Sequence, residues 1–182
     1  MKVLKSSLII FFIIIFLSSC TTDDSNPADI NAQASDLVGT WNLIEENQNG
    51  TVSTLYQGNK VNGTITSTGK NLNTQITFTQ NPNDFNATGN YTDVIKVSVL
   101  GITIVETEID VPISDLIDQG TWSLDQGVLT FSQNGVQQNV RITELTSTIL
   151  KIELDIENLE VNYPDYANTI TINSTVKMTF TK

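Results

Sequence analysis

Apolar and polar side chains alternate along most of the chain after residue 37, and an apolar repeat of 3.6 residues is nearly absent. Segment 170–180 places isoleucine, valine, methionine and phenylalanine mainly on one face, with threonine, asparagine and lysine on the other. Such a period of two residues is typical of a half-buried β-strand. The pattern predicts an all-β protein of about ten strands. Residues 111–120 form at most a helical turn, because Pro112 and Gly120 limit it.

Turn-forming residues separate these segments at short intervals. Asp125-Gln126-Gly127 and Asn134-Gly135 stand between alternating runs, and Asn-Gly is a strong signal for a two-residue hairpin. Short turns between strands predict an antiparallel meander. A meander removes its exposed edges by closing into a barrel, here of about 8–10 strands. A β-sandwich is the alternative, because the alternation alone does not distinguish the two architectures.

The N-terminal segment has the features of an export signal. Lys2 and Lys5 precede the apolar run Leu8–Leu17, which is followed by small residues and by Cys20, the only cysteine of the chain. The run is shorter than the roughly 20 residues that span a membrane. The ending "FLSSC" resembles the lipobox of bacterial lipoproteins. This resemblance implies a signal peptide over 1–19 and a lipid anchor on Cys20.

Residues 20–36 are polar, acidic and free of aromatic side chains, a composition typical of a flexible tether. The "TTDD" after Cys20 is similar to the acidic signals that direct lipoproteins to the cell surface in Bacteroidetes, although a solvated linker has the same composition. Residues 37–182 are then one domain of ordinary size. We expect a protein of the bacterial cell envelope that is anchored to the outer membrane.

The charge and the residue types exclude several classes of function. The net charge of −11 becomes −13 once Lys2 and Lys5 are removed, which argues against nucleic acid as a partner. The absence of histidine removes the commonest general base and the histidine zinc sites. We therefore predict a protein without catalytic residues, bound metal or cofactor.

Two acidic ladders remain as candidates for chemistry. Each has carboxylates at every second position of a predicted strand, which places them on one face. Calcium binding and carboxylate catalysis are the alternatives to a solvated face, but no calcium-loop motif and no facing pair of carboxylates is evident. We expect solvated faces at Glu106, Glu108 and Asp110, and at Glu153, Asp155 and Glu157.

Gly-Thr-Trp occurs twice, around the two tryptophans Trp41 and Trp122. The first copy, "LVGTWNLIE", resembles the Gly-x-Trp motif that opens the first strand of lipocalins. In that family the tryptophan closes the barrel end. The resemblance implies that Trp41 is structural, that its N–H bonds to a carbonyl from the other end of the chain, and that Gly39 lets the chain bend. Core packing is also expected of Trp122.

The order of further motifs is similar to that of the lipocalin-like lipoproteins of Bacteroidetes. These motifs are "ITFTQNPNDFNATGNY", "GTWSLDQGVLTF", "VRITELTSTILKIEL" and a closing strand that ends in "TF". The resemblance covers most of 37–182 and implies a lipocalin-like barrel. Segment 91–112 departs from it, because it is longer than a minimal barrel needs.

Two functions follow from these expectations. The first is the binding of a small apolar ligand inside the barrel. The second is a surface module that contacts a protein or a glycan, with Tyr163, Tyr166 and segment 91–112 as contact candidates. The side chains expected to face inward, as pocket wall or as filled core, are Ile76, Phe78, Leu129, Phe131, Ile142, Ile152, Leu154, Met178 and Phe180.

Overall fold

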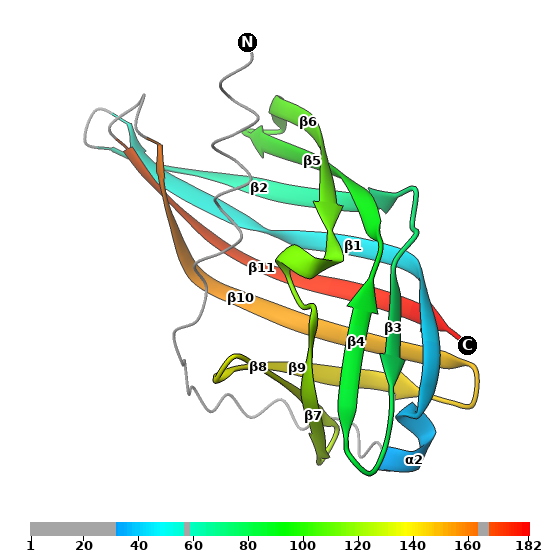
Figure 1. The fold of residues 1–182 in the computed structure, drawn as a ribbon. Coiled ribbons are helices and arrows are strands. Elements are labelled where there is room, and N and C mark those ends of the chain that lie inside the picture. The colour runs from blue at the N-terminus through cyan, green and yellow to red at the C-terminus, as the bar shows by residue number, and fades with distance from the viewer. Residues whose placement is uncertain (1–31, 57–58, 164–167) are drawn as a thin grey trace.

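The computed structural model describes residues 32–56, 59–163 and 168–182. The described strands form one antiparallel sheet, and eight of them close into a barrel (Figure 1). A single closed sheet excludes the β-sandwich and confirms the predicted barrel. The barrel strands are β1 (Gly39–Tyr56), β3 (Gln75–Phe78), β4 (Asp84–Thr88), β7 (Gln119–Asp125), β8 (Val128–Gln133), β9 (Val136–Leu145), β10 (Ile149–Tyr163) and β11 (Asn168–Thr181).

Pairing between the first and the last strand closes the barrel. Residues of β1 from Asn42 to Thr54 pair with residues of β11 from Thr181 to Ile170. The register shifts once, between Leu43 and Glu45, which marks a β-bulge at Ile44. Around the barrel each strand pairs with its neighbours in chain order, so the architecture is a meander with two excursions.

The two excursions build a second part of the sheet, which we call the wing. The wing strands are β2 (Asn59–Lys70), β5 (Asn90–Val99) and β6 (Ile102–Pro112), in the order β1-β2-β5-β6. Figure 1 shows them extending from the upper half of β1, beyond the barrel. Segment 91–112, which is long for a minimal barrel, is accounted for by the β5–β6 hairpin.

Hairpin turns lie where the sequence predicts them. Gln126 and Gly127 have φ values of +46° and +78°, and Asn134 and Gly135 have +52° and +80°. Positive φ at both central residues is the requirement of the tight hairpin turn that Asn-Gly favours. Helical structure among the described residues is short: α2 (Ala34–Leu37) precedes β1, and the 3₁₀ turn η2 (Ile113–Asp115) follows β6. Ala34 of α2, at the end of the predicted tether, packs against the barrel core.

Two apolar clusters hold the sheet. The larger one fills the barrel and includes Leu37, Trp41, Leu43 and Phe180. The smaller one, here named the wing cluster, is formed by Val52, Ile65 and Ile172, with four further aliphatic side chains packed against it.

Candidate functional site

The nine side chains predicted to face inward all lie in or against the barrel core. Two of them, Leu154 and Met178, are half-buried and pack against the core. The other seven are at most 7 % exposed and belong to it: Ile76, Phe78, Leu129, Phe131, Ile142, Ile152 and Phe180.

Side chains fill this interior. A cavity large enough for a ligand would leave accessible surface on the residues that line it, but Phe78, Leu129, Ile142 and Phe180 are at most 1 % exposed. A barrel of about eight strands is just wide enough for side chains to fill it. These nine residues therefore act as a core in the structure, and no open pocket wall is seen among them.

An aromatic group forms the centre of the core. The ring centroids of Phe78 and Trp122 are 5.7 Å apart at an angle of 84°, and those of Phe85 and Phe131 are 4.9 Å apart at 75°. Edge-on contacts of this kind add to the stabilisation that burial provides. The Trp122 Nε1–H also donates to the carbonyl oxygens of Thr79 and Asp84, at 2.9 and 3.1 Å. The second Gly-Thr-Trp is thus a packing element.

Trp41 is fully buried at the end of the barrel. Its Nε1–H donates to the carbonyl oxygen of Leu37 at 2.7 Å, so the expected carbonyl from the other end of the chain is wrong. That end does reach the indole, because Lys182 Nζ lies 4.5 Å from the ring centroid. Gly39 has a φ of +131°, and a Cβ there would lie 3.0 Å from Lys182 Cε. The positive φ favours glycine at this bend, whereas the contact is with the end of a flexible side chain that can move aside.

Polar side chains form a buried layer where the barrel meets the wing. Along β1 the inward side chains run from Leu43 in the barrel core, through Glu46 and Gln48, to Val52 in the wing cluster. The Gln48 amide donates to the Ser174 hydroxyl at 2.8 Å, and the Ser67 hydroxyl donates to Gln48 Oε1 at 3.3 Å. The two apolar clusters are therefore separated by a hydrogen-bonded layer.

Two carboxyl groups belong to this layer. Glu46 is 2 % exposed and Asp93 is 5 % exposed, and both carboxyl groups lie beside Ser67. One oxygen of each, Glu46 Oε2 and Asp93 Oδ1, has no hydrogen-bond partner within the described ranges. Burying such an oxygen is costly when the group carries a charge.

Burial changes the protonation of both groups. Desolvation, with a further contribution from the charge of Asp93, raises the pKa of Glu46 to about 8, although the Gly69 backbone and Ser67 oppose the shift. Desolvation also raises the pKa of Asp93 and that of the neighbouring Tyr91. Around neutral pH, Glu46 is therefore mostly a neutral acid.

Sequence reasoning missed Glu46 because of the bulge in β1. Strict alternation from Trp41 and Leu43 places Glu45 inward and Glu46 outward. The extra residue at Ile44 reverses this, so that Ile44 is 50 % exposed and Glu46 is buried. A bulge re-aims the side chains that follow it, and the run "NLIEEN" carries no signal that locates one.

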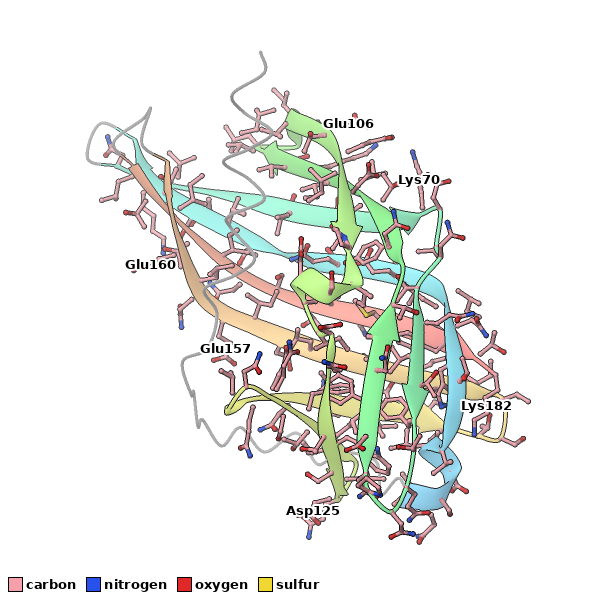
Figure 2. The ribbon with its side chains drawn as sticks, in the orientation of Figure 1. Lys70, Glu106, Asp125, Glu157, Glu160 and Lys182 are labelled. Atoms are coloured by element: carbon pink, nitrogen blue, oxygen red, sulfur yellow. The ribbon has the colours of Figure 1, made fainter. Side chains whose placement is uncertain are left out.

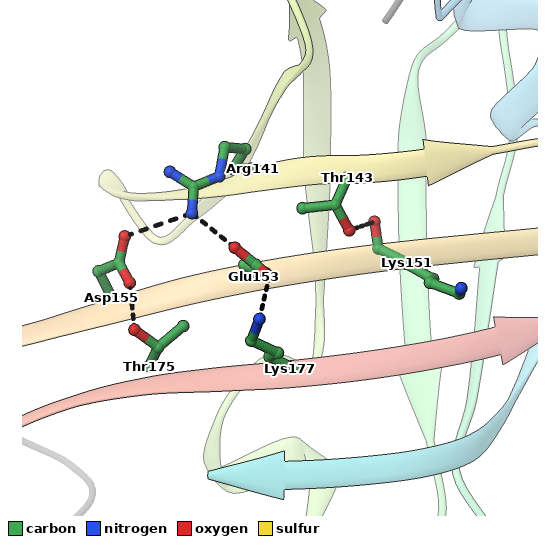
Figure 3. Close-up of polar contacts among 7 residues, drawn as sticks. All are labelled: Arg141, Thr143, Lys151, Glu153, Asp155, Thr175 and Lys177. Atoms are coloured by element: carbon green, nitrogen blue, oxygen red, sulfur yellow. Dashed lines mark hydrogen bonds and ion pairs between the residues drawn. The ribbon is translucent and has the colours of Figure 1, made fainter. Parts of the chain in front are cut away.

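Two carboxylates of the second acidic ladder, Glu153 and Asp155, are partly neutralised by cations (Figure 3). Glu153 contacts Arg141 and, at 2.7 Å, Lys177 Nζ, and these hydrogen bonds lower its pKa. Asp155 accepts a hydrogen bond from the Thr175 hydroxyl at 2.7 Å. Among the described residues, no group of three Asp, Glu, Cys or His side chains is placed to hold a metal ion.

Two hollows of the described surface are open to solvent. One, of about 220 Å³, is lined by polar side chains of β1, β2 and β11, and the other, of about 290 Å³, lies near Lys60 and Glu160. Neither hollow includes a residue predicted to line the barrel. Cys20 and Tyr166 lie outside the described residues, as does the side chain of Tyr163.

Comparison with known proteins gives one match. Residues 37–152, more than half of the chain, match the family model described as "Lipocalin-like domain". No curated protein and no solved structure matches significantly. None of the helices in the described ranges is long and apolar enough to cross a membrane.

Proposed function

The chain belongs to the lipocalin-like domain family, and from this premise we propose that it is a non-enzymatic, lipid-anchored protein of the bacterial cell envelope whose barrel is a scaffold for contacts with a partner. A lipocalin-like barrel fits either a ligand-binding or a scaffold role. The observation that favours the scaffold is the filled interior, in which the central side chains are at most 1 % exposed.

A small apolar ligand is the second candidate. Lipocalin-like domains bind such ligands, and the half-buried Leu154 and Met178 leave some apolar surface beside the core. Ligand carriage needs the core to open, since the described hollows are polar and open to solvent.

A direct test separates the two candidates. Residues 21–182, produced without the predicted signal and anchor, are purified and extracted with organic solvent, and the extract is analysed by mass spectrometry. We expect no apolar molecule in stoichiometric amount, because side chains occupy the interior. One lipid-like molecule per chain would contradict the scaffold role and favour carriage.

The anchor has its own test. Cys20→Ala should abolish incorporation of radiolabelled fatty acid and release the protein from the membrane fraction, because the lipobox-like "FLSSC" leaves no other thiol to carry acyl chains. Ser19→Ala keeps a small residue before the cysteine and is the control, with labelling expected as in the natural chain. Equal labelling of the Cys20→Ala protein would show that the cysteine is not the attachment site.

The proposed location is the outer membrane, with the barrel on the cell surface. The "TTDD" behind Cys20 supports this, through its similarity to the surface signals of Bacteroidetes lipoproteins. The acidic net charge keeps the barrel from lying on an anionic bilayer.

A further inference from the structure

The strand β6 forms a free edge of the wing. It pairs with β5 on one side and ends the strand order of the sheet, so the described part of the chain offers no partner for its other side. A strand in this position presents unpaired N–H and C=O groups, which can pair with an added strand.

Exposed apolar side chains concentrate at this edge. Ile102, Ile104 and Val105 are 68 %, 59 % and 45 % exposed, and Leu100 in the turn before them is 94 % exposed. The rest of the described surface carries only three other large apolar side chains of comparable exposure, and these are dispersed over β1 and β8. Apolar surface gathered in one place on a soluble domain commonly marks an interaction site.

The two faces of β6 differ in chemistry. Register with β5 places Val105, Thr107 and Ile109 on the face that carries Val97 and Ile95. Glu106 and Glu108 lie on the opposite face, where they pair with Lys96 and Lys70 at 3.0 and 2.9 Å. Figure 2 shows Glu106 and Lys70 at the solvent boundary of the wing. Asp110 continues the acidic face and accepts a hydrogen bond from Thr92.

A strand that pairs with β6 must match both faces. Its side chains alternate, so those beside Val105 and Ile109 are apolar and those beside Glu106 and Glu108 are cationic. The existing ion pairs do not prevent this, because the Glu106 and Glu108 side chains are 57 % and 58 % exposed. Exposed pairs of this kind contribute little stability and can exchange partners.

A second copy of the chain fits this edge poorly. Pairing β6 with another β6 sets acidic residues beside acidic residues, and like charges directly opposite each other are destabilising. The upper part of β10, which is the other free edge of the sheet, carries Asp155, Glu157 and Glu160, so pairing β6 with it also sets acidic residues beside acidic residues.

We propose that the free edge of β6 binds an extended segment of a partner protein, in which lysine or arginine alternates with β-branched apolar residues, by strand addition. The bound segment continues the wing beyond β6. This inference rests on the proposed scaffold function, since it specifies the kind of partner that the scaffold binds.

The test uses the lipidated chain in nanodiscs of zwitterionic phospholipid, with empty nanodiscs as the background. Three fluorescent eight-residue peptides are compared by anisotropy: alternating Lys-Val, Glu-Val and Lys-Gly. We expect the Lys-Val peptide to bind about tenfold more tightly than either of the others, because only it matches both faces of β6. Hydrogen exchange should show new protection of amides within 102–111, as added strand pairing requires. Equal binding of Lys-Gly, or protection elsewhere, would overturn strand addition.

A charge exchange supplies the matched variant. The double variant Glu106→Lys, Glu108→Lys should lower the affinity for the Lys-Val peptide about tenfold. It should then bind the Glu-Val peptide more tightly than the Lys-Val peptide. New binding of the Glu-Val peptide shows that the variant is folded. Unchanged preference for Lys-Val overturns the proposal for β6. If no peptide binds and the barrel holds no ligand, the inference about β6 is wrong but the proposed scaffold function stands. If a lipid is recovered from the barrel, the scaffold function itself is contradicted.

Discussion

Phe131→Ala is expected to destabilise the protein by about 3–5 kcal/mol, a cost typical of removing a buried phenylalanine. Phe131 is 3 % exposed, and its ring packs against Phe85 and Phe78, with centroids 4.9 and 6.0 Å away. Equilibrium unfolding in urea measures the change. Val128→Ala on the same strand is the control, because Val128 is 38 % exposed and its truncation should cost about 0.5 kcal/mol or less.

The same variant tests whether the natural barrel is filled. Truncation of Phe131 leaves an apolar void, which a molecule such as benzene can occupy. Benzene should therefore raise the melting temperature of Phe131→Ala and leave that of the natural protein unchanged. An equal rise in both proteins would show that the natural barrel already has space for a ligand, contrary to the proposed scaffold role.

The second large effect concerns the pH dependence of stability at Glu46. Its pKa is about 8 in the folded protein and about 4.5 when the chain is unfolded, so the folded state holds the proton more tightly. The stabilisation is complete below the unfolded value and is lost as pH rises through about 8. The loss between pH 4.5 and 8 is on the order of 3–5 kcal/mol.

Glu46→Gln removes this titration. The variant should be close to the natural protein at pH 5 and more stable above pH 8, as measured by urea unfolding at several pH values. Glu45→Gln makes the same chemical change at an exposed position and is the control. Asp93→Asn should make this loss of stability smaller and end it at a lower pH, because the charge of Asp93 helps to raise the folded-state pKa of Glu46. Parallel pH profiles for the natural protein and Glu46→Gln would exclude Glu46 as the titrating group.

The barrel itself was predictable from the sequence, for a physical reason. Alternation decides which side chains share a face before any tertiary contact forms, and residues such as Phe78, Leu129 and Phe180 lie in the core as their alternation indicates. Asn134-Gly135 sets a tight hairpin through local backbone preference alone.

The wing was only partly predictable. The sequence indicates that 91–112 is long for a barrel, and its alternation indicates strands, but it does not say where they pair. The pairing partner of β5 is β2, which itself extends from the upper half of β1. The pairing of β5 with β2 depends on how far β1 extends beyond the barrel, and the alternation of side chains does not give that length.

Local sequence therefore determined the strands, the hairpin turns and the facing of most core residues, because each of these depends on neighbours along the chain. The tertiary structure decided three further properties: the packing that leaves no space in the barrel centre, the burial of Glu46 beside Asp93, and the free edge at β6. These depend on contacts between distant segments, and the bulge at Ile44 shows how one inserted residue turns a carboxyl group from solvent into the interior.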